Sequence, residues 1–162
     1  MKHLRTALSA AFLLAIAPAT FGAAAFQAFE GDGFDDWQVT GTAFGLSPVH
    51  GKYDGMKTDI KAYANEAFAL SAHGGMDAIG TLTSAEFTIT QNYIAFLIAG
   101  GNQASKTCVQ LIVDGKVAME ATGKRSPIFQ SVQFDVTELK GKKARLRAVD
   151  DTTGAISDRT GW

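Results

Sequence analysis

The chain has 162 residues, with 15 Lys and Arg against 16 Asp and Glu and a formal net charge of −1. This length suits one domain with one core, and the charge balance excludes the strongly basic face of nucleic-acid-binding proteins. The single cysteine, Cys108, excludes an internal disulfide, so the domain must rely on its core, a bound ion or a neighbouring domain.

The first 25 residues have the order of a secretory signal peptide. Lys2 and Arg5 precede an apolar stretch, Ala7–Ala17, which is followed by the small residues Ala23–Ala25. This stretch is shorter than the roughly 20 residues of a membrane span. We predict cleavage after Ala25, with cleavage after Ala24 as the alternative. Residues 26–162 would then form one secreted or periplasmic domain without a membrane span.

After the predicted signal peptide, apolar and polar residues alternate, which is typical of antiparallel strands with one solvent-exposed face. Val132, Phe134 and Val136, for example, share one face of a strand. The predicted strands are Phe26–Glu30, Trp37–Phe44, Glu66–Ala72, Gly80–Thr90, Tyr93–Gly100, Thr107–Val113, Val117–Thr122, a strand around Ser131–Val136 and a strand over Lys143–Ala148. A short helical turn is expected within Gly55–Ala64.

Two strand features are more specific. Ile94–Ile98 is apolar on both faces, which favours a central strand. Asp114-Gly115 indicates a hairpin. A two-residue loop would put Lys116 and Ala118 on the face of Val113, so we expect a three-residue loop with a bulge that brings Met119 into phase.

This many short strands joined by Gly- and Asp-containing turns predict an all-β fold. The expected architecture is a two-sheet antiparallel sandwich of jelly-roll type in a single domain.

The stretch FEGDGFDDW, residues 29–37, places four acids close together: Glu30, Asp32, Asp35 and Asp36. It does not fit an EF-hand calcium loop, because position twelve from Asp32 is Ala43. We interpret the acids as a solvated turn. A looser calcium site that uses Glu30 is left open.

Histidine and cysteine provide little sign of catalysis. No Gly-x-Ser-x-Gly or HExxH motif accompanies His73, so a hydrogen-bonding role in a loop is favoured for it. Cys108 lies in a strand-like run and is interpreted as a buried small hydrophobe. The basic run from Lys140 to Arg147 is interpreted as a solvated strand face.

Aromatic side chains can stack on the apolar faces of sugar rings. Trp37 and Tyr93 fall in strand patterns and are expected in the core. Tyr53 and Tyr63 fall in the loop-rich stretch 47–65, where ligand contacts are commoner. With His73, they are the candidate ligand-binding residues.

Several segments together resemble a β-sandwich module found in secreted bacterial proteins beside the catalytic propeller of glycoside hydrolase family 32, the levanases, inulinases and sucrose hydrolases. They are Phe29-Glu30 with Trp37, HGGMDAIGTLTSAEFTIT (73–90), YIAFLIAGG (93–101), TCVQLIVDGKVAMEATG (107–123) and GKKARLRAVDDTTG (141–154).

The resemblance implies a jelly roll similar to carbohydrate-binding modules and galactose-binding-like domains. It also implies a structural calcium that bridges Glu30 and an Asp of a final strand. In that module the chain continues beyond the equivalent of Gly161-Trp162, so the last strand is expected to be missing here. The catalytic motifs W-x-N-D-P-N-G, R-D-P and E-C of the family do not occur in the sequence.

The sequence therefore predicts a protein that is not an enzyme: a secreted β-sandwich that binds carbohydrate or serves as a structural accessory to a fructan-active glycoside hydrolase. Its partners would be a polysaccharide or a neighbouring catalytic domain, and not nucleic acid. Two alternatives are kept. One is a protein-interaction or cell-surface module without a sugar ligand, and the other is a small glycan-active hydrolase that uses His73.

Overall fold

The fold is all-β, with antiparallel sheets and a single turn of 3-10 helix among the described residues. The computed structural model describes residues 29, 31–51, 61, 67–75 and 77–153. Its elements are β1 (Gln38–Gly41), β2 (Val49–His50), β3 (Ala67–Phe68), β4 (Gly80–Thr83), β5 (Phe87–Thr88), β6 (Tyr93–Gly100), β7 (Thr107–Val113), β8 (Lys116–Ala121), β9 (Ser126–Asp135), η1 (Thr137–Leu139) and β10 (Lys143–Asp150).

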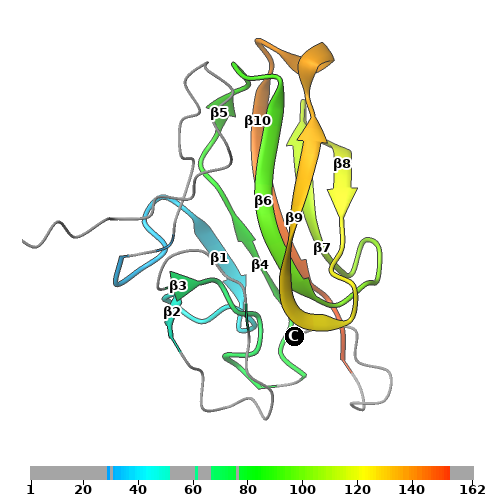
Figure 1. Cartoon of the computed structure of the whole chain (residues 1–162). Helices are drawn as coiled ribbons and strands as arrows, with labels where there is room; N and C mark the ends of the chain where they lie inside the picture. Colours follow the sequence, from blue (N-terminus) through cyan, green and yellow to red (C-terminus); the bar gives the residue numbers. More distant parts are fainter. Residues whose placement is uncertain (1–28, 30, 52–60, 62–66, 76, 154–162) are drawn as a thin grey trace, which may run out of the picture.

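The largest sheet has the strand order β1-β4-β10-β7-β8, with β5 paired to β10 beyond the end of β4. The other described pairs are β2-β3 and β6-β9. Figure 1 shows β6 and β9 in front of β10 and β7. The all-β prediction is confirmed, whereas the jelly-roll topology stays a prediction.

The main core lies between the β6-β9 pair and the large sheet. Leu111 and Leu146 of the sheet pack in one cluster with Phe134 of β9 and with Val136, which directly follows β9, and Leu111 is completely buried. Ile94 and Phe96 of β6 pack against the same cluster. Burying a leucine side chain contributes about 1.5–3 kcal/mol, so this cluster holds the two layers together.

Two predictions about individual strands are corrected. In the described part of the chain β6 pairs with β9 alone, so it is not the central strand expected from Ile94–Ile98. Tyr93 at its start is half exposed rather than in the core. On its other face β6 carries Ala95, Leu97 and Ala99, which are partly buried. Both faces of β6 are therefore apolar although the strand is not central.

The β7-β8 hairpin has a two-residue loop rather than the predicted three-residue loop. Val113 pairs with Lys116, and both Asp114 and Gly115 have positive φ, as such tight hairpin loops require. The extra residue lies inside β8 instead, because the register shifts so that Leu111 pairs with Met119. Met119 therefore reaches the core face as expected, through a bulge in the strand.

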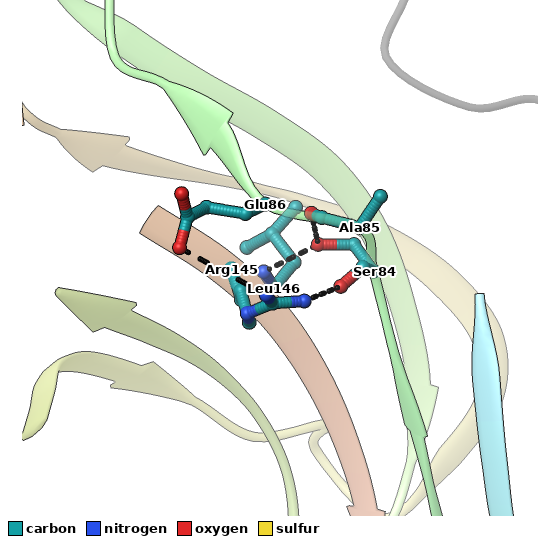
Figure 2. Close-up of polar contacts among 5 residues, drawn as sticks. All are labelled: Ser84, Ala85, Glu86, Arg145 and Leu146. Atoms are coloured by element: carbon teal, nitrogen blue, oxygen red, sulfur yellow. Dashed lines mark hydrogen bonds and ion pairs between the residues drawn. The ribbon is translucent and has the colours of Figure 1, made fainter. Parts of the chain in front are cut away.

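The break between β4 and β5 is closed by one buried serine (Figure 2). The amide of Ser84 donates to the carbonyl of Leu146 at 2.8 Å, and the Ser84 hydroxyl accepts from the Leu146 amide at 2.9 Å. The same hydroxyl donates to the Ala85 carbonyl at 2.8 Å. Ser84 thus replaces a lost ladder bond of β10, since buried backbone groups need partners.

The remaining expectations differ in outcome. The predicted strand Phe26–Glu30 lies outside the described residues except for Phe29, which belongs to no strand. The expected helical turn in Gly55–Ala64 also lies outside them, apart from Lys61, which forms a parallel bridge with Ile128. No helix in the described ranges is long and apolar enough to cross a membrane.

Candidate functional site

Three of the four predicted site residues, Tyr53, Tyr63 and Glu30, lie outside the described residues. Their proposed roles in stacking on sugar and in binding calcium therefore stay predictions. Around Glu30, the described acids Asp32, Asp35 and Asp36 are exposed, as a solvated turn requires. Within the part of the chain that the structure describes, no group of three or more His, Cys, Asp or Glu side chains is placed to hold a metal ion.

His73 lies in the turn that follows β3. Its amide donates to the carbonyl of Ala43 at 3.0 Å. Its ring packs against Gly45, because a Cβ added to that glycine would lie 2.8 Å from the His73 Cγ. Gly45 also has a φ of +66°, a conformation that favours glycine. His73 is thus held against the loop between β1 and β2, and its role in ligand binding stays a prediction.

A buried carboxyl that sequence analysis did not single out lies beside the same turn. Asp150, the last residue of β10, is 7% exposed. Its carboxylate accepts hydrogen bonds from the hydroxyls of Ser71, at 2.5 Å, and Thr152, at 2.8 Å. The alternation of Ala144, Leu146 and Ala148 could have revealed it, because Asp150 is the next residue on that inward face.

Burial raises the pKa of Asp150, and the two hydroxyl bonds offset only part of this effect. A carboxyl kept protonated to higher pH than usual is suited to donating a proton. The turn after β3 thus brings Ser71 to the end of β10, where the chain has a carboxyl with a perturbed pKa.

The raised pKa of Asp150 should be visible in the pH dependence of stability. Because the folded state holds this proton more tightly than the unfolded chain, whose ordinary pKa is 3.8, the contribution is complete below pH 3.8. It is lost as the pH rises through the folded-state pKa. Urea unfolding from about pH 3 to about pH 7 should show wild type losing stability relative to Asp150→Asn. A difference that is constant with pH would contradict this assignment.

A second polar cluster crosses the face of the large sheet that points away from the core. One register row contains a polar residue from each of five neighbouring strands, and these residues are Gln38, Thr83, Arg147, Gln110 and Glu120. Leu82, Ala148 and Leu111 occupy the alternate, core-facing positions of these strands. We call this set the polar row.

Three members of the polar row form a continuous hydrogen-bonded chain. Arg147 donates to the Gln110 side-chain oxygen from Nε at 3.0 Å and from a terminal nitrogen at 2.6 Å. Gln110 in turn donates to Glu120 at 2.8 Å, and the other Glu120 oxygen accepts the Ser105 amide at 2.9 Å. Gln110 is 5% exposed, so the neighbouring charged side chains cover it and are held in place by it.

The electrostatics at Glu120 and Cys108 follow from this chain. Burial opposes ionisation of Glu120, but hydrogen bonds from Gln110, Ser105 and Cys108 outweigh burial and lower its pKa. For Cys108, burial, its hydrogen bond to Glu120 and the charge of that carboxylate raise the thiol pKa to about 12. The thiolate is the reactive form of cysteine, so Cys108 is unsuited to nucleophilic chemistry.

Native Cys108 should therefore resist alkylation. We expect iodoacetamide at about pH 8 to leave the folded chain unlabelled and to label it completely in urea, since an ordinary cysteine has a substantial thiolate fraction there. Mass spectrometry of the two samples provides the measurement. Equal labelling rates with and without urea would show that the thiol is accessible and ionised in the fold.

The basic residues between Lys140 and Arg147 lie partly in the turn before β10 and partly on the outward face of the large sheet. Lys142 precedes β10 and lies 3.6 Å from Asp114. Lys143, Arg145 and Arg147 alternate along the outward face of β10. Arg145 donates to the Ser84 carbonyl at 3.2 Å and lies 3.8 Å from Glu86 (Figure 2). Arg145 and Arg147 are half-buried, so the expectation of a solvated strand face holds only for Lys143.

Comparison with known proteins finds a relative that matches over part of its length. The chain is 33% identical over 131 residues, 79% of its length, to a protein of Aspergillus rugulosus named "Putative glycosyl hydrolase ecdE". The aligned part is 18% of that protein, so the chain spans about a fifth of its relative. No protein-family model and no solved structure match the chain. The similarity supports a carbohydrate-related role.

The similarity also corrects one prediction. The absence of the family 32 catalytic motifs led to the expectation that the chain is not an enzyme. That expectation is wrong, because the named relative is a glycosyl hydrolase by its printed description and thus points to an enzyme. Motifs of one catalytic domain are a weak basis for such an exclusion, because unrelated sites can perform the same chemistry.

Proposed function

We propose that the chain is a carbohydrate-binding β-domain of a secreted protein of glycoside-hydrolase type. The observation that carries this proposal is the 33% identity over 131 residues to part of a protein named as a glycosyl hydrolase. The jelly-roll topology, the link to family 32 and fructan as the polymer are finer proposals, which rest on the resemblance of segments such as 73–90 and 107–123. Binding would act by holding the polymer at high effective concentration.

The chemistry of the polar row is compatible with this role. Sugar hydroxyls donate and accept hydrogen bonds at once, and Arg147, Gln110 and Glu120 offer both kinds of group on rigid strands. Fixed polar groups on strands cost little conformational entropy when a ligand binds.

Affinity electrophoresis tests the proposal. The chain is run in native gels that contain levan, inulin or other polysaccharides, beside a reference protein that binds none of them. We expect at least one polymer to retard the chain and to leave the reference protein unchanged. Unchanged mobility in every polymer would refute carbohydrate binding and favour an interaction module without a sugar ligand.

Hydrolysis is the second candidate function, and two observations favour it: the printed name of the relative and the buried Asp150 beside the turn that carries His73. A water molecule would attack the anomeric carbon while Asp150 donates its proton to the leaving oxygen of the glycosidic bond, and the Asp150 carboxylate would then take up the proton that this water loses. The test is release of reducing sugar. Loss of release in Asp150→Asn, with release retained in the exposed control Asp36→Asn, would support this function. Equal release by both variants would refute the role of Asp150.

The calcium site at Glu30 is proposed on the resemblance alone. If Glu30 binds the ion, calcium should stabilise wild type by about 2.7 kcal/mol when its concentration is 100 times the dissociation constant. The melting temperature should then rise for wild type and for the control Asp32→Asn, and stay unchanged for Glu30→Gln. The same rise in all three proteins would exclude Glu30 as a ligand.

A further inference from the structure

The outward face of β10 combines a row of cations with few carboxylate partners. Lys143, Arg145 and Arg147 lie at alternate positions of the strand, which is the third strand in the five-strand order. Of the three, Arg145 is accompanied by Glu86 at 3.8 Å. In the described part of the chain no carboxylate lies within ion-pair distance of Lys143 or Arg147.

Arg147 is the cation whose geometry is best defined. Its Nε and one terminal nitrogen both donate to the neutral side-chain oxygen of Gln110, and Glu120 fixes Gln110 from the other side. Two of the five N–H groups of a guanidinium are then used. Its remaining donors, including both N–H groups of the other terminal nitrogen, find no partner among the residues that the structure describes.

Such a half-buried guanidinium is preorganised for an anion. A planar carboxylate can accept two parallel hydrogen bonds from the free edge of a guanidinium, and these charge-assisted bonds are about twice as strong as neutral ones. The lateral neighbour on β4, Thr83, adds a hydroxyl group at the same register level. Lys143, farther along β10, adds a second unpaired positive charge. The same face also carries the carboxylates of Glu86 and Glu120. Because Lys143, Arg145 and Arg147 outnumber these two acids, charge complementarity favours an acidic ligand over a neutral one.

We propose that this outward face binds an acidic polysaccharide, with the carboxylate of a uronic acid residue on Arg147 and neighbouring hydroxyls on the polar row. The inference rests on the proposed carbohydrate role and narrows its substrate class. It replaces the neutral fructan that the resemblance implies with a charged polymer. The polymer lies across the strands, where Gln38, Thr83 and Arg147 follow one another.

The experiment compares charged and neutral polymers with the whole chain. Affinity electrophoresis uses polygalacturonate as the acidic probe and levan and inulin as neutral probes. Arg147→Met removes the positive charge and keeps most of the apolar part of the side chain. Arg147→Lys keeps the charge but lacks the planar guanidinium that donates two parallel hydrogen bonds. Lys142→Met is the control, because it removes a cation that lies before β10. Thermal unfolding of each variant shows whether it is folded.

Polygalacturonate should retard wild type and Lys142→Met equally. It should bind Arg147→Met about tenfold or more weakly, and Arg147→Lys with intermediate strength. Raising the ionic strength from about 0.01 M to about 0.15 M shortens the screening length from about 30 Å to about 8 Å. Binding of wild type should weaken accordingly, and this measurement does not depend on whether a variant folds.

Two results would overturn the inference separately from the proposed function. Binding of levan or inulin by wild type without binding of polygalacturonate would keep the carbohydrate role and reject the acidic ligand. Binding of polygalacturonate that is insensitive to salt and equal in Arg147→Lys and wild type would reject Arg147 as the contact. Retardation by none of these polymers or others would refute the proposed function itself.

Discussion

Replacing Leu111 with alanine is expected to lower the free energy of unfolding by about 2–5 kcal/mol. Leu111 is completely buried and pairs with Leu146 and Met119 in the large sheet. It also packs in one cluster with Phe134 of the opposite layer. The lost stability has two parts: the removed methyl and methylene groups no longer gain from burial, and a cavity remains between the two layers. Stabilities of small domains are about 5–15 kcal/mol, so this change is a large share of the total.

Urea unfolding measures the change, and Val117→Ala is the matched control. Val117 lies in the adjacent strand but is 48% exposed, so its truncation should change stability by about 0.5 kcal/mol or less. Equal unfolding midpoints for Leu111→Ala and Val117→Ala would mean that the cluster between the two layers does not hold the fold together.

Replacing Ser84 with alanine is expected to cost about 1–3 kcal/mol, an unusually large effect for one hydroxyl group. The Ser84 hydroxyl accepts from the Leu146 amide at 2.9 Å, and Ser84 is 2% exposed. Alanine would leave that amide buried without an acceptor, at the point where β4 gives way to β5. The cost is then the desolvation of the amide, which exceeds the net value of an ordinary hydrogen bond.

Glu86→Gln controls for the neighbouring ion pair that Figure 2 also shows. Glu86 lies 3.8 Å from Arg145, and both side chains are nearly half exposed. Exposed pairs of this kind contribute about 0–1 kcal/mol. Chemical unfolding of the two variants should therefore show a clearly larger loss for Ser84→Ala. A loss of the same size in both would mean that water replaces the Ser84 hydroxyl.

Local patterns predicted two long strands closely, but they predicted only the second half of β9, the longest strand, and they predicted the short strands poorly. Tyr93–Gly100 and Thr107–Val113 were predicted with their observed bounds, because an apolar run between turn residues has few other structures available. The predicted strand Gly80–Thr90 is interrupted, since Ser84 leaves the ladder and forms side-chain bonds to β10. The two-residue strand β2 was not predicted at all.

The hairpin shows how a correct face can accompany a wrong loop. Alternation correctly predicted that Met119 shares the face of Leu111, because burial decides which side of a strand is apolar. The position of the extra residue was wrong, because Asp114 and Gly115 can both adopt positive φ and close a two-residue loop. The register shift then falls within β8.

The candidate site divides in the same way. The amino-acid sequence by itself determined the strand faces. Period-two alternation alone predicted that Arg147 lies on the face of its strand that is opposite to the face of Leu146. Only the tertiary structure decided that Arg147, Gln110 and Glu120 form one hydrogen-bonded chain, and that Asp150 meets Ser71 at the end of β10. The physical reason is that periodicity reports burial along one strand. Which side chains meet across strands depends on which strands pair and in what register. Both are set by contacts between segments that lie far apart in the sequence.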